Sequence, residues 1–252
     1  MSLSSNLRIR MRLLRAVLTK RFIYPDVVDV ALTFGNLPVP DVAGDLEPID
    51  LLHHVGGLDS RAWPDFSALR PDAMVGGPTD RENWSSERNA AEFIGRFTAA
   101  LQAGVVIELG CFIGYTSAHI ATALRSQRQP GHLHYVDCAD DCLVATAANL
   151  KRFGLESLAT PHRGTSCDPA VLAELPSAAD LIFIDTTHAY EDTRVEIATH
   201  APRLSSRGCL ALHDSIRFPG VRRAIAEVRD RFRICTFATE RGNGLSVLVP
   251  RR

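Results

Sequence analysis

The chain has 252 residues, of which 46% are hydrophobic and 23% are charged, and its formal net charge is -1. This composition supports a full hydrophobic core, and the near-neutral charge gives no basis for expecting a nucleic-acid-binding protein. No apolar run reaches the roughly 18 residues that a membrane-spanning helix requires, so no transmembrane segment is expected.

Six cysteines are scattered along the chain without a Cys-x-x-Cys pair. Several of them fall inside predicted strands or beside a glycine turn. This distribution favours reduced cysteines in a cytoplasmic protein over disulfides or a zinc site.

Residues 1–21 carry basic but no acidic side chains, and their leucines and Met11 recur at helical spacing. We interpret this segment as a helix that packs on the domain or on a second subunit, which makes it a candidate element of a homo-oligomer. A helix on an anionic membrane surface is an alternative. A targeting peptide is a weaker one, because no small-residue cleavage signal follows.

Residues 22–84 are rich in proline and glycine and lack sustained periodicity. The aromatic residues Trp63, Phe66 and Trp84 favour a packed segment over a loose tail. Long irregular stretches in compact proteins are usually functional or disordered. We expect a lid or wall over a substrate, with a plain structural wrap as the alternative. The sequence thus divides into an extension, 1–85, and a main domain, 86–252.

A helix is predicted over residues 86–102. Ser86 is its expected N-cap, and Glu87 suits the positive end of the helix dipole. Its apolar residues form one stripe at helical spacing. They are Ala90, Phe93, Ile94, Phe97 and Leu101.

Strands and helices then alternate to the end of the chain. Strands are expected at 105–110, 132–137, 158–163, 179–185, 208–213, 233–238 and 245–249. Helices are expected between them at 116–124, 141–153, 190–204 and 220–232. This alternation predicts an α/β fold with a parallel sheet and right-handed crossovers. Pro161 indicates that the third strand lies at a sheet edge, and the glycines around Asn243 predict a closing hairpin with one antiparallel strand.

The first strand leads into a glycine turn and a helix N-terminus. Glu108 stands near the strand end, and Gly110 and Gly114 follow it. Such a junction points backbone N–H groups at a ligand, and glycine lets that ligand come close. A dinucleotide fingerprint needs a third glycine and an acid further along the chain. An acid at position 108 instead suits a ligand with an ammonium or sulfonium cation.

The residues Glu108-Leu-Gly-Cys-Phe-Ile-Gly-Tyr-Thr-Ser117 resemble the first motif of class I S-adenosylmethionine (SAM) dependent methyltransferases. Their Gly-Tyr-Thr-Ser ending looks most like the catechol and caffeoyl-CoA O-methyltransferase branch. The order of strands and helices is similar to the Rossmann-like fold of that class. The resemblance implies a seven-stranded, mostly parallel sheet with strand order 3-2-1-4-5-7-6 and helices on both faces.

The same resemblance implies SAM as the cofactor. Asp137 would accept the ribose hydroxyls, unless it only caps the next helix. Ser166 would contact the adenine amine, unless it caps a helix that starts near Asp168, and Tyr115 and Ser117 would shape the methionine end. The implied cofactor residues are Glu108, Gly110, Gly114, Tyr115, Thr116, Ser117, Asp137, Thr165, Ser166 and Asp185.

Two apolar strands each end at an aspartate. Asp185 closes one of them, and Asp214 follows the next. Neighbouring strands lie about 4.8 Å apart, so the two carboxylates should face each other at the mouth of the ligand crevice. Like charges so close are unfavourable unless a cation bridges them, and a hard divalent ion such as Mg²⁺ suits oxygen ligands. The ion would lower the pKa of a substrate hydroxyl, and His188 could accept its proton.

Asp185-x-x-His188-x-Tyr190 followed by His213-Asp214 is similar to a bacterial small-molecule methyltransferase family, often labelled methyltransferase 24. It also looks like the metal-dependent sugar O-methyltransferases of macrolide biosynthesis. In those enzymes the corresponding aspartates bind Mg²⁺ and the histidine is the proposed base. The third ligand stays open, because the catechol branch has asparagine where this chain has Ser215 and the sugar enzymes have glutamate where it has His213. We take Asp185, Asp214 and His213 as the candidate metal ligands.

The sequence therefore predicts a SAM-dependent O-methyltransferase that acts on a hydroxyl of a small molecule, such as a sugar or a natural-product intermediate. His188 and Asp185 are its candidate catalytic residues. A metal-independent methyltransferase with His188 alone as base is the first alternative. A nucleotide-binding oxidoreductase and a non-catalytic SAM-binding protein are the others.

Overall fold

The computed structural model describes residues 69, 74–77, 84–237, 239 and 241–251. The predicted N-terminal helix and most of the predicted lid lie outside these residues, so both stay predictions. In the part of the chain that is described, no helix has the length and apolarity needed to cross a membrane.

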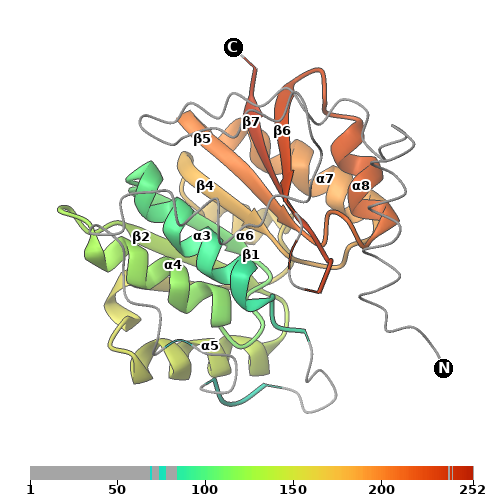
Figure 1. Cartoon of the computed structure of the whole chain (residues 1–252). Coiled ribbons are helices and arrows are strands. Elements are labelled where there is room, and N and C mark those ends of the chain that lie inside the picture. Colours follow the sequence, from blue (N-terminus) through green and yellow to red (C-terminus); the bar gives the residue numbers. More distant parts are fainter. Residues whose placement is uncertain (1–68, 70–73, 78–83, 238, 240, 252) are drawn as a thin grey trace.

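Within the described residues, seven strands form one sheet in the order β3-β2-β1-β4-β5-β7-β6 (Figure 1). Neighbouring strands from β3 to β5 are parallel, and β7 is antiparallel to both β5 and β6. The predicted fold class, strand order and edge position of the third strand are therefore confirmed. The strands are β1 (Val105–Leu109), β2 (His132–Asp137), β3 (Ala159–Arg163), β4 (Ala179–Ile184), β5 (Leu204–His213), β6 (Phe232–Phe237) and β7 (Leu245–Pro250).

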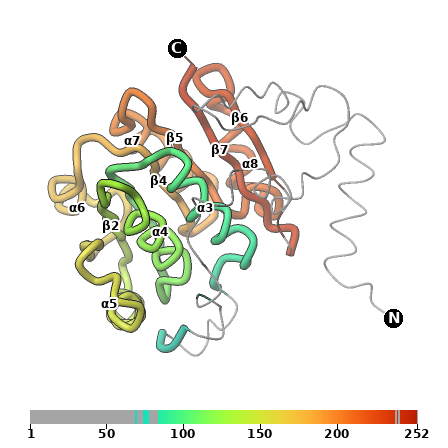
Figure 2. The backbone as a smooth tube through the Cα atoms, turned by 60° about the vertical axis from the view of Figure 1, so that its left-hand side comes forward, coloured from blue at the N-terminus to red at the C-terminus, as the bar shows by residue number. Residues whose placement is uncertain are grey.

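Helices cover both faces of the sheet (Figures 1 and 2). Successive strand side chains point to opposite faces, so Val106 joins the core under α3, α4 and α5, while Ile107 joins the core under α6, α7 and α8. Both residues are fully buried. The helices are α3 (Arg88–Leu101), α4 (Tyr115–Ser126), α5 (Asp140–Arg152), α6 (Pro169–Glu174), α7 (Tyr190–His200) and α8 (Pro219–Ala226).

The start of α3 differs from its prediction in a way that matters for the site. Glu87, not Ser86, occupies the N-cap position, and it makes no side-chain cap. The Ser86 hydroxyl donates instead to Asp185 Oδ2 at 2.9 Å. The prediction that Ser86 caps this helix is therefore wrong, because a tertiary partner takes its side chain.

The helix predicted at 220–232 is also shorter than expected. It ends at Ala226, and turns lead from there into β6. The cause is the sheet, since Phe232 must already pair with Pro250 as the first residue of β6. Conversely, β5 begins at Leu204, four positions before the predicted start at 208.

Candidate active site

The parallel strands bring the predicted acids to one edge of the sheet. Leu109 pairs with Ile184, and Ile184 pairs with Leu212, so β1, β4 and β5 end level with one another. The Asp185 N–H continues this ladder and donates to Leu109 O at 2.9 Å. The carboxyl ends of these strands therefore form one rim, where ligands bind in open α/β sheets.

The glycine turn packs directly against the end of β4. Gly110 has φ +86°, and a Cβ built on it would lie 2.0 Å from the carbonyl oxygen of Asp185. Gly114 has φ +81°, and its Cβ would lie 2.8 Å from Thr146 Cγ2. Both positions thus require glycine for backbone conformation and for space. The turn ends at the N-terminus of α4, as predicted from the sequence.

Glu108 is buried at the end of β1, with 1% of its surface exposed. Its Oε2 accepts a hydrogen bond of 2.5 Å from the Ser117 hydroxyl. Burial raises the pKa of Glu108 to about 8, the Ser117 bond opposes the rise, and the charges of Asp185 and Asp137 add to it. Among the described residues no cation pairs with this carboxylate, so a ligand ammonium group would meet an acceptor here.

Asp137 holds the glycine turn in place. Its Oδ2 accepts from the N–H groups of Cys111 at 3.2 Å and Phe112 at 3.1 Å, and its Oδ1 accepts from Ala139 N–H at 3.0 Å. The carboxylate thus lies at the end of β2 beside the turn, as expected. The predicted contact with a ribose stays a prediction.

Ser166 after β3 and Thr186 after β4 share a carboxylate that sequence reasoning missed. The Ser166 hydroxyl donates to Glu196 Oε1 at 2.5 Å, and the Thr186 hydroxyl donates to Glu196 Oε2 at 2.9 Å. Ser166 Oγ keeps its acceptor capacity for the predicted adenine amine. Thr165 is exposed beside it. Nothing in the sequence indicates that Glu196, in the middle of α7, is buried.

Tyr115 and Thr116 begin α4 and are buried. The Tyr115 ring lies edge-on to His119, with ring centroids 5.0 Å apart. The Thr116 hydroxyl donates to Ser86 Oγ at 3.2 Å. These residues line the turn, and their predicted contacts with the methionine end of SAM stay predictions.

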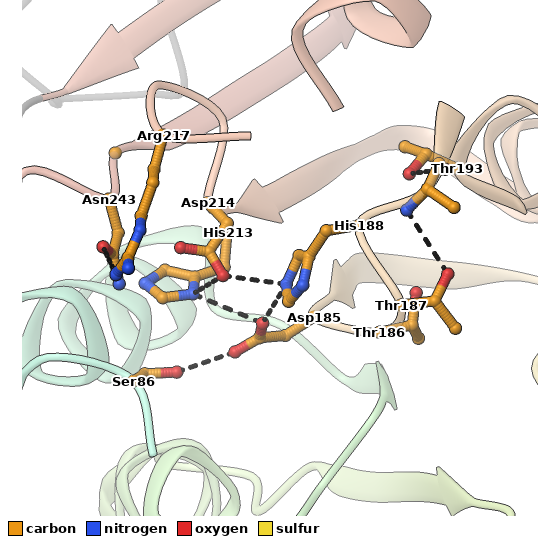
Figure 3. A network of polar contacts seen from close by, with 12 residues as sticks. Ser86, Asp185, Thr186, Thr187, His188, Thr193, His213, Asp214, Arg217 and Asn243 are labelled. Atoms are coloured by element: carbon orange, nitrogen blue, oxygen red, sulfur yellow. Dashed lines mark hydrogen bonds and ion pairs between the residues drawn. The ribbon is translucent and has the colours of Figure 1, made fainter. Parts of the chain in front are cut away.

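Two aspartates and two histidines form a cluster at the ends of β4 and β5 (Figure 3). His188 Nε2 lies 3.2 Å from Asp185 Oδ1 and 2.8 Å from Asp214 Oδ2. His213 Nδ1 lies 3.3 Å from Asp185 Oδ1 and 3.6 Å from Asp214 Oδ2. Each histidine therefore contacts both carboxylates.

Backbone strain accompanies this cluster. His188 has φ +61° and Asp214 has φ +58°, both in the left-handed region that non-glycine residues seldom adopt. The Phe218 ring stacks on His188, with centroids 4.5 Å apart and planes 24° apart. Such strained residues cluster at functional sites, where surrounding contacts hold them in place.

The carboxylates and histidines shift one another's pKa values. Burial alone would lower the pKa of His188, but hydrogen bonds to Asp185 and Asp214 and their charges raise it to about 9. Burial likewise opposes protonation of His213, yet Asp185, Asp214 and Glu87 raise its pKa well above the ordinary value. Burial would raise the pKa of Asp185, and the histidines lower it instead. Both histidine pKa shifts therefore run toward the protonated imidazole, and their cause is the pair of neighbouring carboxylates.

Asp185, His188 and Asp214 also meet the spacing of a metal site. One potential ligand atom from each lies within 4.8 Å of the others. Asp214 Oδ1 is buried and has no hydrogen-bond partner among the described residues, which leaves an acceptor open for a cation. The two carboxylates suit a hard divalent ion, whereas the His188 nitrogen is a softer donor. The predicted ligand His213 stands next to this group, and whether it binds a metal stays untested.

Two comparisons bear on this site. Residues 107–215 match the methyltransferase 24 family model, which is described as a methyltransferase domain. This stretch runs from β1 to just beyond Asp214 and so contains the acids of the rim. Among curated proteins, none matches the sequence significantly.

Solved structures share the fold at low sequence identity. The O-methyltransferase TomG from Streptomyces achromogenes, involved in tomaymycin synthesis and bound to SAM, is 17% identical over 69% of this chain and 84% of its own, with a TM-score of 0.58. The methyltransferase PaMTH1 of Podospora anserina, bound to S-adenosylhomocysteine (SAH), is 14% identical over 72% and 92%, with a TM-score of 0.59. A Bacillus cereus O-methyltransferase, also bound to SAH, is 15% identical over 67% and 84%, with a TM-score of 0.59.

Proposed function

We propose that this chain methylates a hydroxyl of a small molecule. The premise is that it is a class I SAM-dependent methyltransferase, since its residues 107–215 match the methyltransferase 24 family. The observation that carries the proposal is that two groups of residues lie side by side at the carboxyl ends of the parallel strands. Buried Glu108 lies beside a glycine turn, and the cluster of Asp185, His188 and Asp214 lies on the neighbouring strands. The first group suits a methyl donor, and the second suits a hydroxyl that must lose its proton.

SAM would lie across the ends of β1, β2 and β3. Glu108 would accept from its ammonium group, Asp137 from its ribose, and Ser166 from its adenine amine. Tyr115, Thr116, Ser117 and Thr165 complete the proposed contacts. The steric need for Gly110 and Gly114 supports this arrangement, because both keep the turn close to β4 and α5.

His188 is the proposed base. Its Nε2 faces the two aspartates, and within the described part of the chain its Nδ1 makes no hydrogen bond. Carboxylates that hold one ring nitrogen orient the other toward a proton donor, as in serine protease triads. Nδ1 would then accept the proton of the substrate hydroxyl while SAM and the acceptor are held in line.

We further propose that Asp185 and Asp214 hold a divalent cation, which would be Mg²⁺ given their oxygen donors. Such an ion polarises a bound hydroxyl and lowers its pKa. The bound cation would also offset the negative charge of the two carboxylates. Since that charge raises the pKa of His188 to about 9, the cation would lower this pKa and leave His188 free to accept a proton. Metal-independent methylation is the second candidate, because His188 and His213 each contact both aspartates and His188 could act as base alone.

The acceptor would be a small molecule, such as a sugar, a phenol or a natural-product intermediate; the structural neighbour TomG is involved in tomaymycin synthesis. Cytoplasmic location is part of the proposal, in keeping with six free cysteines. A screen of sugar, catechol and polyketide hydroxyl compounds for SAH formation tests the reaction. SAM binding without turnover on any of these compounds would contradict it.

Asp214→Asn tests the cation. We expect it to weaken Mn²⁺ binding by more than the roughly 10- to 100-fold that loss of a residue supporting a ligand costs, because one charged ligand is itself lost. The measurement is a titration followed by electron paramagnetic resonance. EDTA should abolish SAH formation by the wild type, and Mg²⁺ should restore it. Full activity in EDTA would instead support the metal-independent reaction.

Glu108→Gln tests the donor site through proton release. At pH 6.5 a carboxyl group with a pKa of about 8 is protonated in the free protein, and an ammonium group bound beside it favours the carboxylate. SAM binding should therefore release up to one proton, seen by calorimetry in buffers of different ionisation enthalpy. The variant should release none and bind SAM about 10-fold more weakly or worse. Equal proton release by both proteins would contradict the assigned contact.

A further inference from the structure

Glu87 stands at the N-cap position of α3 but makes no side-chain cap. Its side chain is fully buried and turned toward the candidate active site instead. Glu87 Oε2 lies 2.5 Å from His213 Nε2, and Oε1 accepts from the Thr239 hydroxyl at 2.7 Å and from Asn243 N–H at 3.4 Å. A carboxylate that could cap a helix is thus used to hold a histidine on a distant strand.

His213 is held between carboxylates on both sides. Its Nε2 faces Glu87, and its Nδ1 faces Asp185 Oδ1 and Asp214 Oδ2 at 3.3 and 3.6 Å. The ring therefore stands between Glu87 and the aspartates with one nitrogen toward each side, and its exposed fraction of 3% leaves it little room to turn.

Ser86 adds a second link from the same segment. Its hydroxyl donates to Asp185 Oδ2, while the histidines contact Asp185 Oδ1. Both oxygens of this aspartate are thereby fixed, one of them by a residue adjacent to Glu87. Ser86 and Glu87 precede the stretch 107–215 that matches the methyltransferase family model.

We propose that Glu87 is a positioning residue: it holds His213 with Nδ1 aimed at Asp185 and Asp214, and thereby sets the two carboxylates for cation and substrate. This inference rests on the proposed function. Glu87 contacts neither reacting group itself and acts through the histidine. Partners of this kind around metal ligands fix ligand orientation and basicity.

Two variants and a matched control test the proposal. Glu87→Ala removes the partner of His213, whereas Glu87→Gln keeps an acceptor for Nε2–H and is the variant to use if the alanine protein does not fold. Glu92→Gln is the control, since Glu92 is also a buried carboxylate of α3 but pairs with Arg88. The readouts are Mn²⁺ affinity by electron paramagnetic resonance and SAM affinity by calorimetry.

We expect Glu87→Ala to weaken Mn²⁺ binding by about 10- to 100-fold and Glu87→Gln to weaken it less. SAM affinity should stay within about twofold in both, because the described residues show no hydrogen bond or ion pair between Glu87 and the glycine turn, and the control should change neither affinity. Unchanged Mn²⁺ affinity in both folded variants would overturn the proposal. An equal loss of both affinities would also overturn it, because it would indicate a purely structural role.

A crystal structure of the folded Glu87 variant gives a readout that needs no metal. We expect the His213 ring to turn or shift, with Nδ1 leaving its position 3.3 Å from Asp185 Oδ1. An unmoved ring and unmoved aspartates would overturn the positioning role. If the wild type binds no Mn²⁺, the metal part of the proposed function fails, and this structure alone decides the inference about Glu87.

Discussion

Replacing His188 by glutamine is expected to lower kcat for methyl transfer by about 10²- to 10⁴-fold, the range that general bases contribute. Glutamine is polar and close in size, but it cannot accept the proton of a hydroxyl at neutral pH. SAM affinity should stay within about twofold, because His188 lies on the acceptor side of the rim. The measurements are SAH formation with an acceptor from the screen and SAM binding by calorimetry.

His132→Gln is the matched control for this variant. His132 begins β2 and pairs with Val105 at the start of β1, so it lies at the amino ends of the strands, whereas the site lies at their carboxyl ends. Its ring bonds Thr160 at 2.8 Å. The control should retain wild-type kcat. Comparable rates in the His188 variant and the wild type would remove His188 as the base and leave deprotonation to the metal site.

Gly110→Ala is expected to weaken SAM binding by about 100-fold, the cost of misplacing a binding element by roughly 1 Å. The added methyl group would lie 2.0 Å from the carbonyl oxygen of Asp185, so the turn and the end of β4 must separate. Overpacking costs about 1–3 kcal/mol and the left-handed backbone about 1–2 kcal/mol, so the free energy of unfolding should fall by about 2–5 kcal/mol. Calorimetry with SAM and urea denaturation measure the two effects.

Gly154→Ala is the control that separates the cost of a positive φ from the cost of the steric clash at Gly110. Gly154 also has positive φ, at +64°, but a Cβ there would meet nothing within 4 Å. This variant should lose only about 1–2 kcal/mol of stability and keep its SAM affinity. If both alanine variants lose the same stability and both bind SAM normally, the close packing of the turn on β4 is not what forms the donor site.

Much of this architecture could be predicted because its signals are local. The run before Gly110 is apolar except for Glu108, the run before Asp185 is continuously apolar from Leu181, and each is bounded by a turn, as buried parallel strands are. Parallel strands with helical crossovers place their carboxyl ends together, so acids at strand ends predict a common rim. The positions of Glu108, Asp185 and Asp214 at one edge followed from that geometry.

The supporting contacts could not be predicted in the same way. The residues that Ser86 and Glu87 contact are far away in the sequence: Asp185 is 99 positions from Ser86, and His213 is 126 positions from Glu87. At the start of α3 both residues look like ordinary capping and dipole residues, and only tertiary packing reassigns them. The same reason applies to His213. Its position at a strand end is as compatible with a metal ligand as with a buried partner of Glu87.

The most direct test of this account is a crystal of the full chain grown with SAH and Mn²⁺ and measured for anomalous scattering. We predict SAH across the ends of β1, β2 and β3 with its ammonium group at Glu108, and an anomalous peak between Asp185 and Asp214. The homocysteine sulfur should face that peak across the acceptor site. SAH bound away from the glycine turn, or Mn²⁺ on another face of the sheet, would contradict the central claim that donor and acceptor meet at this rim.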